Sequence, residues 1–334
     1  MDAFELGEFG LIERLRAALP PAADARLLLG IGDDAAAWRS GGGCTLATTD
    51  TMVAGVHFLP GRVAWRDVGW KALAVNVSDI AAMGGTPSFA LVTLCLQPDA
   101  RVEDIDALYA GLGACAEAYG VTIAGGDIVT APVFAVTVAL AGDAVLGADG
   151  APALLRRDGA RPGDSIAVTG ALGGSAGGLR ALLEDAAASP ESAPLIERHM
   201  RPRPRVDAGH AAIAAGVRCG IDISDGLAQD LGHVCRASGV DAELWLPRVP
   251  LDPALVARYA ADAPGMAASG GEDYELILIA SEALIRDAEA ALGAPLTVVG
   301  RIVEGAGVVH ALDAQGREVP VTAGWDHLAR ERRP

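Results

Sequence analysis

The stretch Asn76-Val77-Ser78-Asp79-Ile80-Ala81-Ala82-Met83-Gly84 is the most informative part of this 334-residue sequence. The apolar pattern predicts a helix from Arg66 to Met83, and Gly84-Gly85 predicts where that helix ends. Asp79 therefore lies near the carboxyl end of a largely apolar helix, where burial and the helix dipole both disfavour a carboxylate. A carboxylate in that place needs a compensating cation.

Acidic side chains also follow apolar strands elsewhere in the sequence. Gly32-Asp33-Asp34 comes after a predicted strand at Leu27–Ile31, and Asp50 comes after one at Thr45–Thr49. Asp, Thr and Gly are ordinary turn formers, so each cluster alone is better explained by structure than by function. The arrangement recurs at Gly125-Gly126-Asp127 after a strand at Val121–Ala124, at Asp222-Ile223-Ser224-Asp225-Gly226, and at Gly270-Gly271-Glu272-Asp273. This recurrence favours a shared role for the acids.

Carboxylates at several strand ends, flanked by glycine and hydroxyl side chains, are typical ligands of Mg²⁺. Because Mg²⁺ completes its shell with water and substrate phosphates, many aspartates predict several ions on a nucleotide triphosphate. The sequence has no G-x-x-x-x-G-K-[ST] loop, and Lys71 is its only lysine, which argues against P-loop and protein-kinase chemistry. Arginine and metal must then neutralise the phosphates, and Arg156, Arg157 and the glycine-rich turn after Gly170 are available.

Other classes of protein are disfavoured by composition. The six histidines form no H-E-x-x-H pair, no G-x-S-x-G elbow is present, and the five cysteines form no C-x-x-C pair. The 43 acidic and 26 basic residues leave a net charge of −17, which argues against nucleic acid as a partner. No apolar run reaches the about 20 residues that span a bilayer, and the N-terminus lacks a signal pattern, so we expect a cytoplasmic protein without a membrane partner.

The length predicts two domains of roughly 150 residues each, with a single large α/β domain as the alternative. In the first half we expect a helix from Phe9 to Leu19, and strands at Phe89–Leu96 and Val133–Leu140 around a helix at Val102–Tyr119. Residues 141–163 are rich in Gly, Ala, Pro and charge, which places the boundary near Gly150 and gives domains 1–150 and 151–334. The second half opens with a strand at Ser165–Thr169 and a glycine-rich turn at 170–178.

Six motifs occur in order along the chain: Gly32-Asp33-Asp34-Ala35, Thr49-Asp50-Thr51 with Gly55-Val56-His57-Phe58, residues 76–84, Gly125-Gly126-Asp127, Ile223-Ser224-Asp225-Gly226-Leu227, and Gly270-Gly271-Glu272-Asp273-Tyr274-Glu275-Leu276. Taken together, they closely resemble those of the thiamine-monophosphate kinase family. The match continues in order to Trp325. The resemblance implies the α+β fold of the superfamily of aminoimidazole ribonucleotide synthetase and selenophosphate synthetase. In that fold the first domain dimerises through its β-sheet, and a C-terminal domain of α/β sandwich type completes the nucleotide and substrate site.

The resemblance also implies ATP-dependent phosphorylation of thiamine monophosphate to thiamine diphosphate, the last step of thiamine diphosphate biosynthesis, by a homodimer that uses several Mg²⁺ ions. The implied magnesium ligands are Asp34, Thr48, Thr49, Asp50, Asp79, Asp127, Asp222 and Asp225. The implied ATP contacts are Tyr109, Gly126, Asp127, Arg157 and Ser224. The implied contacts of thiamine monophosphate are His57, Glu272 and Trp325. Ile128 departs from the family, where many members carry Thr, and this removes a possible hydroxyl near the phosphates.

No covalent nucleophile or obligate base is expected, because the acceptor phosphate is already largely anionic, with a second pKa of about 6. We therefore expect direct in-line transfer with metal charge on the transferring group. Two alternatives remain: another ATP-dependent synthetase of the same superfamily, and a non-catalytic protein that binds metal or nucleotide. The sequence lacks the cysteine-ending tail of the hydrogenase maturation type, since it stops at Glu331-Arg332-Arg333-Pro334, and it lacks the early catalytic Cys or Lys of selenophosphate synthetase.

Overall fold

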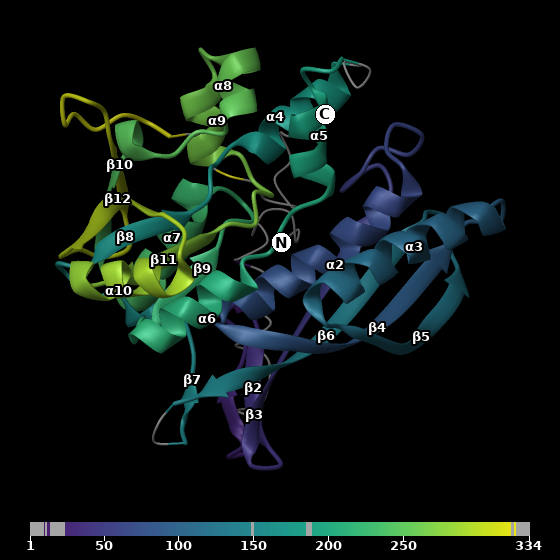
Figure 1. The fold of residues 1–334 in the computed structure, drawn as a ribbon, viewed down its shortest axis with the longest axis horizontal. Coiled ribbons are helices and arrows are strands. Elements are labelled where there is room, and N and C mark those ends of the chain that lie inside the picture. The colour runs from purple at the N-terminus through teal and green to yellow at the C-terminus, as the bar shows by residue number, and fades with distance from the viewer. Residues whose placement is uncertain are drawn as a thin grey trace.

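The computed structural model describes residues 10, 12–13, 24–147, 150–184, 189–321 and 324. These residues form an α+β fold of two units, each built on its own sheet, as the sequence predicted (Figure 1). The predicted helix from Phe9 to Leu19 lies largely outside the described residues, and so does Trp325. The domain boundary near Gly150 stays a prediction. None of the helices in the described ranges is both long enough and apolar enough to cross a bilayer.

The first sheet has the strand order β1-β2-β3-β6-β4-β5, and β7 pairs with β6. Its neighbours are antiparallel except for β4 and β5, which are parallel. The strands are β1 (Leu27–Leu29), β2 (Ala36–Ser40), β3 (Gly43–Val53), β4 (Gly85–Leu96), β5 (Thr122–Thr130), β6 (Ala135–Leu146) and β7 (Pro152–Ala153).

Two helices, α2 (Trp65–Ala82) and α3 (Val102–Tyr119), lie along one face of this sheet (Figure 1). Strand β4 shows why this face is the buried one: Val92 and Leu94 are buried, whereas the alternate residues Phe89 and Leu91 are 58% and 54% exposed. The helices touch through their backbones. A Cβ added at Gly69 would lie 1.9 Å from the carbonyl oxygen of Leu108, so this position requires glycine.

The second sheet has the order β13-β10-β12-β8-β11-β9. Its strands are β8 (Ser165–Thr169), β9 (Cys219–Asp222), β10 (Asp241–Trp245), β11 (Leu276–Ala280), β12 (Leu296–Val303) and β13 (Val309–Leu312). The helices of this half are η1 (Arg157–Gly159), α4 (Gly174–Leu183), α5 (Ala193–Met200), α6 (Val206–Ala215), α7 (Leu227–Ser238), η3 (Leu246–Arg248), α8 (Pro253–Tyr259), α9 (Ala263–Ser269) and α10 (Glu282–Leu292). The central strands β8 and β11 are buried, as Ile166 and Ile277 show.

The two units meet along α2. A Cβ added at Gly209 of α6 would lie 2.4 Å from the carbonyl oxygen of Ala81, so α6 and the end of α2 approach each other at backbone distance. The backbone N–H of Leu155 donates to the carbonyl oxygen of Met83 at 3.2 Å. This packing brings Asp79, near the end of α2, beside Asp222, at the end of β9.

The predicted helices at Arg66–Met83 and Val102–Tyr119 and the predicted strand at Ser165–Thr169 are found with the same bounds or within one residue of them. Three expectations of turns were wrong. Asp50 and Gly125-Gly126-Asp127 lie inside β3 and β5, because pairing with β6 and β4 continues each strand beyond its apolar run. Residues 174–178 open helix α4 instead of forming a turn, because their glycines let α5 pack closely: a Cβ at Gly178 would lie 2.2 Å from the carbonyl oxygen of Leu195.

Candidate functional site

Three of the predicted carboxylates converge where the two units meet. Asp34, Asp79 and Asp222 each offer an oxygen, and these oxygens lie within 4.8 Å of one another. The three residues come from the loop after β1, the last turn of α2 and the end of β9. Hydroxyl groups orient two of them: Thr48 Oγ1 donates to Asp79 Oδ2, and Ser78 Oγ donates to Asp222 Oδ2, both at 2.5 Å.

The cluster carries more negative charge than the protein around it neutralises. Burial raises the pKa of Asp222 to about 8, and the charge of Asp34 adds to the shift. Burial also holds the pKa of Asp79 well above its ordinary value, reinforced by Asp50 and Asp222. Burial followed by the charge of Asp34 raises the pKa of Asp33 to about 7. All donors are hard oxygens, so the set fits a divalent cation such as Mg²⁺.

Arg157 provides the positive charge nearest to the cluster. Its Nη2 lies 2.6 Å from Asp34 Oδ1, and its Nε lies 3.8 Å from Asp33 Oδ1. Arg156, which was also considered for phosphate, instead pairs with Asp158 on the surface at 2.5 Å. Of these two arginines, only Arg157 is therefore placed to meet a phosphate at the carboxylates.

Ser224 and Asp225 lie in a loop that a buried acid holds from behind. Asp230 of α7 accepts the backbone N–H groups of Ser224, Asp225 and Gly226 at 3.1, 3.1 and 3.0 Å. Asp225, Asp230 and His233 also have ligand atoms within 4.8 Å of one another. Because Asp230 Oδ2 accepts all three N–H groups, we assign Asp230 to shaping the loop and leave Asp225 as the ligand candidate.

Glu272 lies in a segment with unusual backbone geometry. Glu272 and Tyr274 have φ of 67° and 52°, the left-handed region that residues with a Cβ rarely adopt. Glu272 Oε1 lies 2.7 Å from Lys71 Nζ, and Glu272 Oε2 lies 3.3 Å from His199 Nδ1. The next residue, Asp273, accepts the backbone N–H groups of Gly173 and Ser175 at 2.6 and 3.1 Å. Sequence reasoning found Glu272 but missed both of its partners.

Asp127 and Thr49 are not brought to the cluster within one chain. The register aligns Asp127, Thr93, Thr137 and Thr51 in one row across β5, β4, β6 and β3. Side chains in one row share a face, and Thr93 is on the face of Phe89 and Leu91, away from α2. Asp127 and Thr49 are therefore on the outer face of the sheet, whereas Thr48 and Asp50 are on the helix face.

The remaining predicted contacts come from separate elements, and His57 lies close enough to Glu272 to lower the pKa of that carboxyl. The Nδ1 of His57 accepts the backbone N–H of Val53 at 3.0 Å, which fixes the ring beyond the end of β3. Tyr109 lies on α3 and is 38% exposed. Gly126 leaves no room for a side chain, since a Cβ would lie 1.8 Å from the carbonyl oxygen of Val92.

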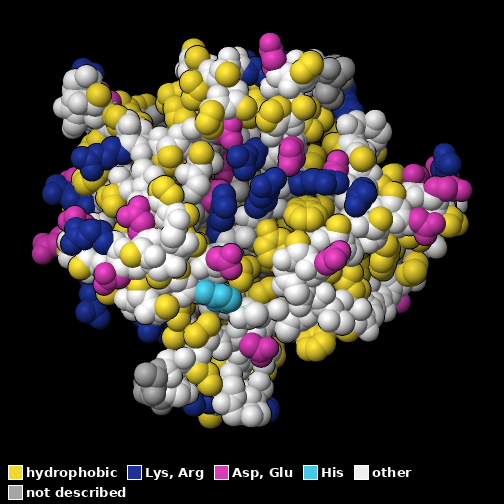
Figure 2. Space-filling view, viewed as in Figure 1, with side chains coloured by type: hydrophobic (Ala, Val, Ile, Leu, Met, Phe, Trp, Pro, Cys, Tyr) yellow, Lys and Arg dark blue, Asp and Glu magenta, His cyan; other side chains and the backbone are white. Residues whose placement is uncertain are grey.

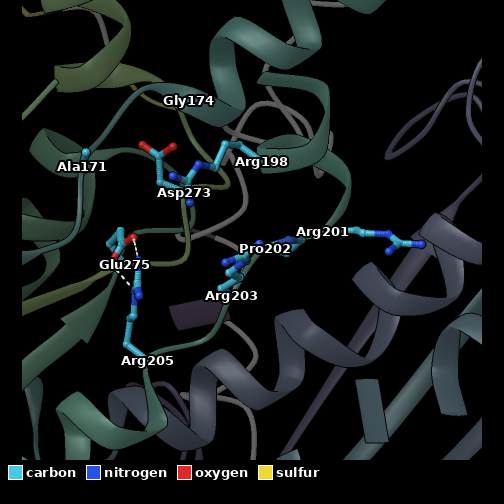
Figure 3. A pocket seen from close by; sticks show the side chains of 9 residues that line it. All are labelled: Ala171, Gly174, Arg198, Arg201, Pro202, Arg203, Arg205, Asp273 and Glu275. Atoms are coloured by element: carbon cyan, nitrogen blue, oxygen red, sulfur yellow. Dashed lines mark hydrogen bonds and ion pairs between the residues drawn. The ribbon is translucent and has the colours of Figure 1, made fainter. Parts of the chain in front are cut away.

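A band of basic side chains crosses one face of the molecule (Figure 2), and the close-up shows four arginines, Glu275 and Asp273 around one pocket (Figure 3). Each arginine pairs with a carboxylate: Arg198 with Asp252, Arg201 with Asp67, Arg203 with Glu197, and Arg205 with Glu275. Of these four partners only Glu275 lines the pocket, so the other three arginines are paired with carboxylates outside it. The repeated arginines at 201–205 were the signal for it in the sequence.

Comparison with known proteins gives a consistent result. The family model described as AIR synthase related protein matches with its N-terminal domain at residues 32–144 and its C-terminal domain at residues 161–313. The thiamine-monophosphate kinase of Aquifex aeolicus (strain VF5) is 36% identical over 329 residues, which cover 97% of this chain and 99% of that protein. The thiamine-monophosphate kinase of Escherichia coli (strain K12) is 38% identical over 337 residues, 97% of this chain and 98% of that protein. The structure of AaThiL complexed with AMPPCP and TMP has a TM-score of 0.84 at 35% identity, and covers 98% of this chain and 99% of that one.

Proposed function

This chain belongs to the family of thiamine-monophosphate kinases, and we propose that it transfers the terminal phosphoryl group of ATP to thiamine monophosphate. A relative of the same fold binds AMPPCP and TMP, which supports a nucleotide and a phosphorylated acceptor as the two substrates. The observation that carries the proposal is the convergence of Asp34, Asp79 and Asp222 at one buried site. Kinase chemistry needs such a site for the charge of a triphosphate.

The proposed metal ligands are Asp34, Thr48, Thr49, Asp50, Asp79, Asp127, Asp222 and Asp225. When bound there, Mg²⁺ would neutralise phosphate charge and orient the transferring group. The protein orients these ligands before any metal binds, because Thr48 and Ser78 hold Asp79 and Asp222 by hydrogen bonds. Asp230 shapes the loop of Asp225. For ATP we propose contacts with Tyr109, Gly126, Asp127, Arg157 and Ser224.

For thiamine monophosphate we propose contacts with His57, Glu272 and Trp325. The acceptor oxygen of its phosphate forms a bond to the γ-phosphorus of ATP, while the bond from that phosphorus to the β–γ bridging oxygen breaks. ADP leaves, and no proton has to be removed from an acceptor that is already ionised, with a phosphate pKa of about 6. The transfer is therefore direct, and the role of the protein is to position the two anions in line.

We also propose that the protein is a homodimer formed through the outer face of the first sheet. Phe89 and Leu91 are large apolar side chains exposed on this face, next to the row of Asp127, Thr93, Thr137 and Thr51, and such an exposed apolar pair on a sheet is typical of an interface. A second copy on this face would cover them. In such a dimer Asp127 and Thr49 would lie against the second chain instead of in solvent, which supports their assignment as ligands.

The test is turnover of thiamine monophosphate with ATP and Mg²⁺, followed by chromatographic detection of thiamine diphosphate and ADP in equal amounts. Thiamine in place of thiamine monophosphate, and EDTA in place of Mg²⁺, are the controls, and neither should give product. ADP formation with another acceptor alone would favour a synthetase of the same superfamily. Nucleotide binding without any turnover would favour a non-catalytic protein and reject the proposal.

A further inference from the structure

Lys71 is the only lysine of the 334-residue chain, whose other basic side chains besides histidine are all arginine. It lies on α2, within the first unit, and its side chain is only 1% exposed. A buried ammonium is costly unless it is paired, and its partner is Glu272 of the second unit at 2.7 Å. Lysine places a compact charge there, whereas the planar guanidinium that the chain uses everywhere else needs more room.

Glu272 is held from a second direction as well. Its other oxygen lies 3.3 Å from His199 Nδ1, and this same nitrogen lies 2.9 Å from Ser175 Oγ. The backbone is fixed too, because the N–H of Glu272 donates to Ser224 at 2.7 Å and that of Tyr274 donates to Ile223 at 2.9 Å. The strained φ of Glu272 is maintained by these contacts.

Glu272 is the ionised partner of Lys71, whereas His199 is neutral. Burial and then the charge of Lys71 lower the pKa of His199 to about 3, so the ring is neutral. Loss of hydration is the largest single effect on Glu272 and would raise its pKa, but the charge and hydrogen bond of Lys71, together with His199 and His57, bring the pKa below its ordinary value. Although Lys71 and His199 are 1% and 3% exposed, Glu272 keeps 29% of its side chain exposed. One side of an ionised carboxylate therefore remains open.

We infer that Lys71 is a positioning residue for the acceptor, which it serves by holding Glu272 with its open side toward a cationic or N–H-donating ring. The inference rests on the proposed function, since it assumes that Glu272 meets thiamine monophosphate. A ring bearing positive charge or an amino group matches an ionised carboxylate that cannot rotate away. Lys71 itself touches neither substrate, because its ammonium is enclosed behind Glu272.

The experiment compares Lys71→Met, Glu272→Gln and the double variant Lys71→Met/Glu272→Gln with the wild type. In Lys71→Met the carboxylate loses its buried partner, so we expect the KM for thiamine monophosphate to rise about tenfold or more while the KM for ATP changes by less than about twofold. The double variant should resemble Glu272→Gln alone, because the two residues act as one unit. Lys71→Arg should recover part of the lost affinity.

A merely structural role for Lys71 gives a different result. It would lower the melting temperature and kcat but would change the KM for thiamine monophosphate and the KM for ATP to the same extent. The effects of Lys71→Met and Glu272→Gln would then add. Should Lys71→Met fail to fold, the double variant, which has no unpaired buried charge, still tests the inference against Glu272→Gln. A wild-type protein that does not phosphorylate thiamine monophosphate would reject the proposed function itself. An unchanged KM for thiamine monophosphate in Lys71→Met, with active wild type, would reject only the role of Lys71.

Discussion

Ser78 donates a hydrogen bond to Asp222 at 2.5 Å, and this bond joins α2 of the first unit to β9 of the second. Both side chains are buried, so the hydroxyl is one of the few groups that can satisfy the Asp222 carboxylate within the described residues. We expect Ser78→Ala to reduce the free energy of unfolding by about 1–3 kcal/mol, because it leaves a buried carboxylate oxygen without its donor. Urea unfolding measures this. Ser40→Ala, at an exposed Ser–Thr contact, is the control and should be near neutral.

The acidic cluster predicts how stability depends on pH when metal is removed. Asp222 has a pKa of about 8 and Asp33 of about 7 in the folded protein, against about 3.9 for an unfolded aspartate. Between these values the unfolded state has lost protons that the folded state retains, so stability falls as pH rises. His199, with a folded pKa of about 3, acts in the opposite direction only below pH about 6.5.

The effect of the acids is therefore measured without the opposing effect of histidine between pH of about 6.5 and about 8. This range lies above the unfolded pKa of histidine and reaches up to the folded pKa of Asp222. In EDTA, the urea midpoint should fall across this window, and Mg²⁺ should reduce the fall by stabilising the ionised form. Asp222→Asn should make the fall in EDTA shallower, with the remaining slope due to Asp33 and other buried acids. A midpoint that rises with pH in EDTA would contradict the charge balance described above.

Two glycines of the helix pair predict opposite effects of the same substitution. Gly69→Ala would place a Cβ 1.9 Å from the carbonyl oxygen of Leu108, so α2 and α3 must separate. We expect a loss of at least about 2 kcal/mol in the free energy of unfolding. Gly113→Ala on the open side of α3 has nothing within 4 Å and should gain up to about 1 kcal/mol from helix propensity. Thermal unfolding of the two variants, measured side by side, checks the helix contact.

Only part of the fold and of the candidate site could be predicted from the sequence. The helix that carries Asp79 follows from its apolar pattern and its terminal glycines, and the convergence of Asp34, Asp79 and Asp222 follows from acids at the ends of apolar segments. Lys71 and His199 could not be found this way, because their significance lies in contacts with Glu272 that span 201 and 73 positions of the chain. We predicted a turn at Asp127, but pairing with β4 continues β5 through this residue. Local propensity contains no information about that neighbouring strand.

The outer face of the first sheet predicts the oligomeric state. Leu91→Asp places a charge beside Phe89, in the exposed apolar pair of this face, so we expect the proposed dimer to dissociate. Sedimentation equilibrium of the purified protein gives the mass. Val256→Asp introduces the same charge at an exposed apolar residue of α8 and should leave the mass unchanged. A wild-type protein that sediments as a monomer at micromolar concentration would reject the proposed interface.

Asp50 and Asp225 test the proposed ligand set by turnover. Asp50 lies on the helix-facing side of β3 near Asp79, and Asp225 lies in the loop that Asp230 fixes. Replacing either by Asn keeps the size of the side chain but removes charge, so we expect kcat to fall by about 100-fold or more while the melting temperature in EDTA is unchanged or higher. Asp143→Asn, an exposed acid on β6 of the same sheet, should retain wild-type turnover. Near-normal kcat in both Asp50→Asn and Asp225→Asn would reject these ligands.

The proposed direct transfer forms no covalent intermediate, so mass spectrometry during turnover should find no phosphorylated aspartate. A trapped phosphoaspartate would reject direct transfer.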